Sequence, residues 1–423
     1  MSTDVSEQLT ISDRTRITFR FECLRAFGSG ILETAGTTFL MLIAIRYFHA
    51  SATMKSLVAV NDKAGLILSP VIVTLVTAFR FRCTRAAAGL LTLGTVGFLA
   101  ATLIPNLYTM VFGSLLGMTC AAAAIPLITQ MYQDNYSTQN RGKLFSRQLF
   151  IRIASAAAFG YLASKFLEGR YDWFQGIMAC FAAAMGLSAF ALYRIPSSPL
   201  ADPGQAARNP FYALRFVRDD KTFRNTLISW MFIGLANLMM QALRVEFLAN
   251  TERYHVTLNG KALDVLFIAL LTDIVPNLAR LCMSPIWGKF FDRFNFFALR
   301  IAINLGFGIA IVTFFTGDTY LGHMLGAVIW GVSIAGGDLC WSLWVTKLAP
   351  PHRVAHYMSI HTFLTGVRGI AAPFLAFGLA QQLSLFWMAV VTSAMILMAC
   401  LVLVPELTAK RPMRPEVEEQ FTE

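Results

Sequence analysis

Ionisable side chains stand well inside long apolar stretches of this sequence, notably Glu33, Asp273 and Arg368. If those stretches cross a lipid bilayer, each charge costs ~2.5–3.5 kcal/mol to insert at a helix centre, so it is expected to serve a function. A partly desolvated carboxylate suits reversible protonation, and a guanidinium offers a planar fork of donors to a carboxylate or phosphate. We therefore expect proton coupling at Glu33 and Asp273, and anion binding at Arg368.

Each of these roles has a structural alternative. The two carboxylates could instead pair with nearby arginines, and the arginines could simply neutralise acids in the same cavity. His361 is a further candidate for proton transfer, with a hydrogen-bonded wall residue as the alternative. The sequence alone leaves these alternatives open.

Polar residues recur at helical spacing along the same stretches, so each helix would present one polar face. Glu22, Arg25, Ser29 and Glu33 form one such series. Others are Arg152 with Ser155, Asp273 with Asn277 and Arg280, and His361 with Thr365 and Arg368. These faces predict a water-filled cavity. Its candidate substrate contacts are Arg25, Arg152, Asn237, Gln241, Asn277, Arg280, Trp330, Asp338, Trp341, Thr365 and Arg368.

Composition supports a membrane location for these helices. The 423 residues are 56% hydrophobic and only 14% charged, whereas a soluble domain carries about 25% charged residues. The seven cysteines show no metal-ligand spacing and are expected to be small hydrophobes. No GxGxxG, P-loop, HExxH or nucleophile-elbow motif is present, so we expect neither an enzyme nor a bound metal or cofactor.

A membrane span needs about 20 mostly apolar residues in helical form, because lipid cannot satisfy loose backbone groups. The sequence predicts an all-α protein with twelve spans, near residues 20–47, 63–79, 86–105, 107–131, 148–167, 173–193, 225–248, 265–287, 298–316, 320–346, 357–379 and 385–404. They divide the chain into a tail at 1–19, six spans over 20–193, a linker at 194–224, six spans over 225–404, and a tail at 405–423. The linker is expected to contain a short amphipathic helix at the membrane surface.

Most Lys and Arg residues of the predicted loops fall on one side of the membrane. The positive-inside rule therefore predicts that the linker and both termini are cytoplasmic, in the cell (inner) membrane. The net charge of +11 follows from this topology. It does not indicate nucleic-acid binding, which would need a folded basic domain.

Two patterns relate the chain to a known family. The two sets of six spans carry a weak internal echo, "RGKLFSRQLF" at 141–150 and "RVAHYMSIHTF" at 353–363. The stretch "WGKFFDRFN" at 287–295 matches part of a loop motif, Gly-x-x-x-Asp-Arg-x-Gly-Arg-Lys/Arg, through Gly288, Asp292 and Arg293. Over its whole length the chain resembles the major facilitator superfamily. That resemblance implies two pseudo-symmetric six-helix bundles that alternate access to a central cavity.

The resemblance also gives the motif a role. It implies that the loop touches the start of the fifth span, where Asp292 would meet the positive end of a helix dipole, worth ~0.3–1 kcal/mol. Arg147 would add an ion pair, and the contact would hold the cytoplasmic side closed. The alternative is that Lys289 and Arg293 only fix topology. The first-half loop at 76–87 keeps the basic residues but lacks the Asp.

The leading functional interpretation is a monomeric secondary transporter, driven by protons or another ion, for a small polar solute of anionic or zwitterionic character. A drug or lipid exporter of the same superfamily is the alternative, although the fifth span lacks the Gly-x-x-x-Gly-Pro run common in such exporters. A non-transporting scaffold for another membrane protein is a second alternative. The polar cavity faces argue against it.

Overall fold

The computed structural model describes residues 11–51, 54, 57–58, 60–167, 170–200, 209–249, 257–258, 261–262, 270–316 and 319–408. In the amino-terminal half the helices are α1 (Ile11–Thr34), α2 (Leu40–Arg46), α4 (Asn61–Ala78), α5 (Cys83–Leu103), α6 (Leu107–Ala123), α7 (Ile125–Asn135), α8 (Arg141–Leu167) and α9 (Phe174–Arg194). In the carboxyl-terminal half they are α10 (Leu214–Asp219), α11 (Lys221–Ala249), α14 (Val275–Arg293), α15 (Phe296–Thr316), α16 (Tyr320–Leu343), α17 (Val345–Leu348), α18 (Val354–Ala380) and α19 (Leu385–Thr408).

Several helices continue one another. A π-helical turn, Ala35–Phe39, joins α1 to α2, and a second one, Leu270–Ile274, leads into α14. With α6–α7 and α16–α17 taken as single units, the described residues form twelve membrane-length helical units. Nine helices among those residues are long and apolar enough to cross a membrane, and the all-α membrane fold is confirmed. A small antiparallel pair, β1 (Thr257–Leu258) and β2 (Lys261–Ala262), lies between α11 and α14 in the sequence.

Helix boundaries differ from the prediction at the chain ends and at the linker. The first helix begins at Ile11, not near residue 20, because polar contacts anchor a segment that hydropathy does not identify. Thr15 donates to the backbone of Asn135 at 2.7 Å, and the Asn135 amide donates to the buried Thr18. The last helix likewise extends to Thr408. Within 194–224, α10 forms the expected short helix and buries Phe216, which stacks on Tyr357.

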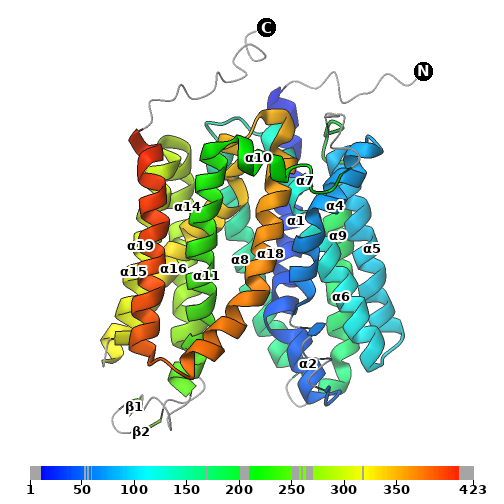
Figure 1. Ribbon diagram of the computed structural model, residues 1–423. Coiled ribbons are helices and arrows are strands. Elements are labelled where there is room, and N and C mark those ends of the chain that lie inside the picture. The colour runs from blue at the N-terminus through cyan, green and yellow to red at the C-terminus, as the bar shows by residue number, and fades with distance from the viewer. Residues whose placement is uncertain are drawn as a thin grey trace, which may run out of the picture.

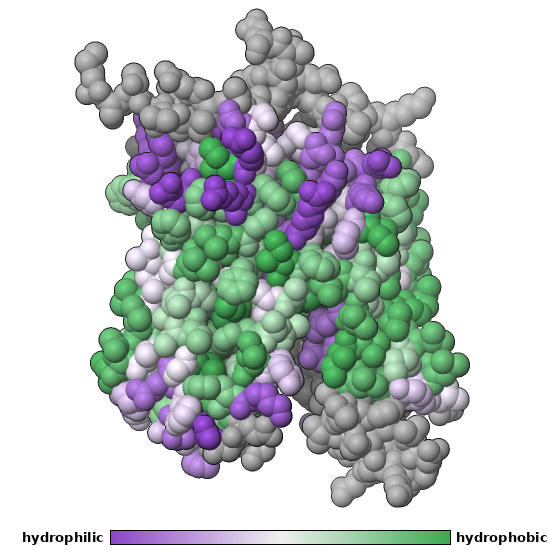
Figure 2. Space-filling model, turned by 180° about the vertical axis from the view of Figure 1, so that it is seen from behind, coloured by the Kyte–Doolittle hydropathy of each residue, from purple (hydrophilic) through white to green (hydrophobic). Residues whose placement is uncertain are grey.

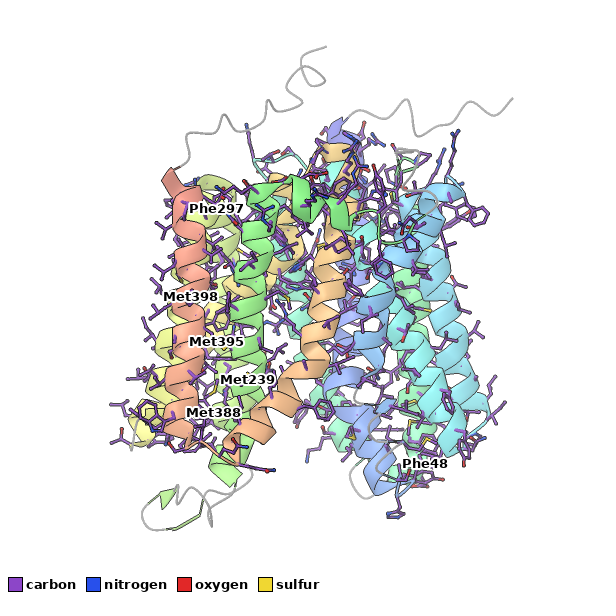
Figure 3. All side chains as sticks on the ribbon, viewed as in Figure 1. Phe48, Met239, Phe297, Met388, Met395 and Met398 are labelled. Atoms are coloured by element: carbon purple, nitrogen blue, oxygen red, sulfur yellow. The ribbon has the colours of Figure 1, made fainter. Side chains whose placement is uncertain are left out.

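Each half packs its helices in the same pattern. In the amino-terminal half α5 contacts α6 and α9, and α1 contacts α8 and α9. In the carboxyl-terminal half the equivalent α15 contacts α16 and α19, and α11 contacts α18 and α19. Met239 on α11 and Met388 on α19 are buried in the second half, and Phe48 lies at the far end of the first half, where it packs on Phe174 (Figure 3). The predicted pseudo-symmetric bundles are therefore present.

Figure 1 shows α1 beginning, α19 ending and α10 lying on one side of the bundle, which we call the linker side. The opposite side, next to β1 and β2, we call the hairpin side. Figure 2 shows an apolar band across this face of the molecule, between two polar edges. Large apolar side chains of the helices, such as Leu103 and Phe374, are more than two-thirds exposed (75% and 78%), as lipid contact requires.

The two halves meet closely on the linker side, where α8 crosses α14 through two glycines. A Cβ atom on Gly142 would lie 2.7 Å from the carbonyl oxygen of Gly288, and one on Gly288 would lie 2.8 Å from that of Gly142. Any side chain at either position would force the helices apart. The crossing explains in physical terms why the loop motif contains Gly288.

Asp292 completes this crossing. Its Oδ1 and Oδ2 accept hydrogen bonds from the backbone amides of Gly142 at 2.7 Å and Lys143 at 2.8 Å. These amides belong to the first turn of α8, where backbone N–H groups have no partner within the helix. Asp292 lies at the carboxyl end of its own helix, where negative charge is unfavourable, and the positive end of α8 offsets that cost.

Gln130 on α7 makes the corresponding contact in the other direction. Its Nε2 donates to the carbonyl oxygen of Pro351 at 2.8 Å, and its Oε1 accepts from the amide of Ala355, in the first turn of α18, at 3.0 Å. Thr77 at the end of α4 lies 3.4 Å from Nε2 of His356. A glutamine therefore occupies the start of α18, as Asp292 occupies the start of α8.

Gly142→Ala should separate α8 from α14, because the added Cβ cannot fit at 2.7 Å from two oxygen atoms. We expect a cost to the closed linker side of about 1–3 kcal/mol and a longer distance between spin labels at the exposed Gln139 and Phe294. Asp292→Asn should shift the same distance by a smaller amount, because it removes the charge and keeps the size.

Gly89→Ala is the matched control, since a Cβ there meets nothing within 4 Å. An unchanged distance distribution in Gly142→Ala would show that the crossing does not depend on close backbone contact.

Candidate functional site

Glu33 lies in the middle of the bundle, two residues before the start of the π-helical turn Ala35–Phe39. Its Oε2 lies 2.9 Å from Nε of Arg152 on α8, in the same half. Its Oε1 lies 3.3 Å from Nη1 of Arg280 on α14, in the opposite half. Oε2 of Glu33 and Nε of Arg152 are close, but their geometry is not that of a hydrogen bond. Both atoms are buried, and neither has a hydrogen-bond partner among the described residues. Glu33 therefore makes an ionic contact between the two halves.

Arg280 extends this contact within the carboxyl-terminal half. Its Nε and Nη2 each lie 2.6 Å from Oδ2 of Asp338 on α16. Its Nη1 is 3.5 Å from Oδ1 of Asn277, whose amide donates to Asp273 at 2.6 Å. We call Glu33, Arg152, Arg280 and Asp338 the central network. It contains two acidic and two basic side chains, so its charges balance.

The side chains of the central network are partly accessible to solvent, although the network lies deep in the bundle. The side chains of Glu33, Arg152 and Asp338 keep 28%, 32% and 30% of their surface exposed, and that of Arg280 keeps 10%. Polar residues toward the hairpin side are also exposed, namely Thr37, Thr38, Gln241 and Asp273. In Figure 2 the surface is hollowed between the two halves on the hairpin side.

Both π-helical turns adjoin this region. One begins two residues after Glu33, and the other contains Asp273. A π-turn disturbs the regular helix hydrogen bonds and is frequent at functional sites. Arg244 on α11 supports the second turn by donating to the carbonyl oxygen of Leu271 at 2.8 Å. Nothing in the sequence pattern indicated these turns.

Arg25, a predicted cavity residue, lies elsewhere. It pairs with both carboxylate oxygens of Glu22 at 2.6 and 2.8 Å and donates to the Tyr132 hydroxyl at 2.9 Å. The same hydroxyl donates to Glu22 at 2.6 Å. All three residues belong to the amino-terminal half near the linker side. The structure therefore places Arg25 in a satisfied cluster, separate from the central network.

Two predicted residues of α11 share one helical face. Gln241 is exposed and Asn237 is half-buried, with an Oδ1 that has no hydrogen-bond partner. Thr365 on α18 is half-buried, and its hydroxyl donates to the backbone of His361 at 2.9 Å. None of these three contacts the central network through a hydrogen bond among the described residues.

The two tryptophans predicted as substrate contacts lie in different places. Trp330 is 4% exposed and packs on Phe307, with the Arg244 guanidinium 5.0 Å from the Trp330 ring. Trp341 is half-buried, 5.4 Å from the ring of His361. Trp330 is thus a packing residue within its own half.

His361 and Arg368 form part of a separate group inside the carboxyl-terminal half. His361 is 1% exposed and lies between the rings of Trp230, Trp341 and Trp344, not at an open mouth. Arg368 is 6% exposed and donates from Nη1 to the carbonyl oxygen of Trp230.

The contact made by the loop motif, Gly288, Asp292 and Arg293, which we call the gate motif, differs from the prediction in one respect. Arg147 is exposed, and the described residues show no ion pair between it and Asp292. The positive groups that act on Asp292 are Lys347 and Arg141. The physical reason is helical phase: the face of α8 that packs against Gly288 carries Gly142 and Ser146, whereas Arg147 lies on the neighbouring exposed face. Arg293 is exposed at the end of α14.

Sequence reasoning missed several residues of these sites. Gln130, Tyr132 and Trp230 have no charge and lie within apolar runs, so no pattern marked them. Arg300 lies near the start of the predicted span 298–316, where an arginine normally reaches water, but it is 2% exposed and lies over the ring of Trp230. All seven cysteines are free thiols, as expected.

The comparisons with known proteins agree with this architecture. The Major Facilitator Superfamily model matches residues 24–373. No curated protein matches the sequence. The fucose:proton symporter FucP of E. coli is 11% identical, with a TM-score of 0.69 over 92% of this chain and 98% of that one.

Two further solved structures share the fold. The human organic anion transporter MFSD10 is 13% identical, with a TM-score of 0.66 over 94% of this chain and 100% of that one. A bacterial homologue of the iron transporter ferroportin, in an outward-facing state, is 14% identical, with a TM-score of 0.70 over 94% of this chain and 99% of that one.

Identities this low establish the fold alone. The family model, however, spans most of the chain, from the α1 charge series through the gate motif to α18. This chain therefore belongs to the major facilitator superfamily.

Proposed function

We propose that the chain is a proton-coupled secondary transporter that moves a small anionic or zwitterionic solute by alternating access. The observation that carries this proposal is the position of Glu33, whose two carboxylate oxygens contact Arg152 in one half and Arg280 in the other. A carboxylate shared by two halves is a contact that protonation can remove. Proton binding would then bias how the halves meet in the membrane.

The solute would compete with Glu33 for the same cations. Arg152 and Arg280 face each other across the two halves, and a carboxylate group of the solute could take the position of the Glu33 carboxylate. Protonation of Glu33 would free these guanidinium groups for the solute. Binding of proton and solute would thus be linked through one pair of arginines, with Asp338 and Asn277 holding Arg280 in place.

The packing supports an outward-facing arrangement for this conformation. Close contacts through Gly142, Asp292 and Gln130 join the halves on the linker side, while exposed polar residues lie toward the hairpin side. FucP has been solved in the outward conformation, as has the ferroportin homologue. Asp292 and Gln130 would act as the gate that must open for release.

The linker side is proposed to face the cytoplasm, because most loop Lys and Arg residues lie there. The protein would sit in the cell membrane as a monomer, since the central network is complete within one chain. A cysteine introduced at Pro210, within the linker, should react with a membrane-impermeant thiol reagent only after the membrane is opened. Labelling of this cysteine in intact cells would contradict the proposed topology.

Glu33→Gln should uncouple transport. We expect solute exchange across proteoliposome membranes to survive, because the arginines remain. Accumulation driven by an inward proton gradient should be lost, because a glutamine carries no proton between the two sides.

Glu22→Gln is the matched control, since Glu22 is a buried carboxylate of the same helix whose partners among the described residues, Arg25 and Tyr132, lie in its own half. Its pH-driven accumulation should persist. If Glu33→Gln still accumulates solute under the gradient, Glu33 is not the coupling group.

A further inference from the structure

A group of donor side chains lies inside the carboxyl-terminal half, away from the central network. It consists of Trp230 on α11, Arg300 on α15, Trp344 at the end of α16, and His361 and Arg368 on α18. We call these five residues the donor cluster.

The donor cluster is compact. The Arg300 guanidinium carbon lies 3.6 Å from the centroid of the Trp230 ring. The His361 ring lies 5.1 Å from Trp230 and 5.2 Å from Trp344. The Arg368 guanidinium packs against Gly234, one turn from Trp230 on the same face of α11.

Among the described residues, five buried nitrogen atoms of the cluster have no hydrogen-bond partner. They are Nε1 of Trp230, Nη1 of Arg300, Nε1 of Trp344, Nε2 of His361 and Nε of Arg368. Indole and guanidinium nitrogens can only donate, and His361 donates from Nε2 in one of its tautomers. A group of unsatisfied donors with no acceptor among them is unusual, because buried polar groups are normally paired.

The cluster also lacks a counter-charge. Arg300 and Arg368 act electrostatically on each other and on His361, and the other groups acting on Arg300 are the thiols of Cys340 and Cys400. Neither arginine has an ion pair within the described part of the chain. All five side chains are at least nine-tenths buried. Two buried cations of like charge require compensation.

Other buried arginines of this protein have such compensation. Arg25 pairs with Glu22, and Arg280 pairs with Asp338 and Glu33. Arg244 has an Nε without a hydrogen-bond partner, but it donates to the carbonyl oxygen of Leu271 and the carboxylate of Asp273 acts on it. Among the described residues, Arg300 and Arg368 therefore lack the nearby carboxylate that these other arginines have.

We propose that the donor cluster binds one small monovalent anion, of the size of chloride or formate. An anion there would accept from several donors at once and neutralise the repulsion between Arg300 and Arg368. Because all five side chains are at least nine-tenths buried, an anion enclosed among them would have to be small. The site is separate from the solute site proposed at Arg152 and Arg280. The anion-binding proposal therefore does not depend on the transport proposal.

The test is thermal unfolding of the purified full-length protein in detergent at constant ionic strength. Sodium gluconate, whose anion is too large for the closed site, is replaced stepwise by sodium chloride or sodium formate. We expect both small anions to raise the unfolding temperature with saturation, because a ligand that binds only the folded state stabilises it by mass action.

Arg368→Met should lower the apparent affinity for chloride about tenfold or more, since one cation and its donors are lost. In gluconate alone it should unfold at a higher temperature than the parent, because the like-charge repulsion is relieved. Arg244→Met is the matched control: it removes a buried arginine of the same half from outside the cluster, and its chloride response should match that of the parent.

Trp344→Phe is the second variant, to be used if Arg368→Met does not fold. It keeps an aromatic ring but removes the indole N–H donor, and it should bind chloride more weakly than the parent. The proposal is overturned if the parent protein shows no saturable response to chloride or formate. It is also overturned if Arg368→Met or Trp344→Phe responds as the parent does. Stabilisation by benzoate alone would contradict a closed small-anion site.

Discussion

The structure depends on one constraint: a charge inside a membrane needs a partner that compensates its lost hydration. Glu33 meets this constraint by contacting Arg152 and Arg280, which belong to different halves of the molecule. Within each half the central network is already neutral, since Glu33 pairs with Arg152 and Arg280 pairs with Asp338. The pair between Glu33 and Arg280 adds a charge contact that exists only while the two halves meet at mid-depth.

Packing on the linker side follows from simpler chemistry. Gly142 and Gly288 let α8 and α14 approach until backbone atoms touch, and Asp292 then satisfies amides that a helix start leaves free. Gln130 does the same for α18 with a neutral amide. Two helix starts, one in each half, are capped by side chains from the opposite half. Separation of the halves would expose both sets of amides at once.

Much of the fold could be predicted from the sequence, because membrane spans are set by length and apolarity. The series Asp273, Asn277, Arg280 also correctly placed three side chains in one connected group. A helical stripe shows which residues share a face, but it does not show which neighbour the face meets. Arg25 therefore joins Tyr132 in its own half, and Arg368 joins Trp230, although the periodicity suggested one common cavity.

Other features had no sequence signal at all. The π-helical turns beside Glu33 and at Asp273 depend on tertiary contacts, such as the Arg244 bond to Leu271, and not on local propensity. Arg300 stood near a predicted helix end, where arginine normally reaches water. Its burial over Trp230 could be found only once α11 and α15 were placed together.

A double-mutant cycle between Glu33 and Arg280 tests the central claim most directly. Glu33→Gln, Arg280→Gln and the double variant are compared by the free-energy difference between hairpin-side open and closed states, taken from spin-label distance distributions. The account predicts strong non-additivity, with a coupling free energy of about 1 kcal/mol or more, because each single variant leaves a charge without its partner across the halves. The corresponding cycle between Glu33 and Arg25 should be additive. Additive effects for Glu33 and Arg280 would contradict the claim that this ion pair joins the two halves.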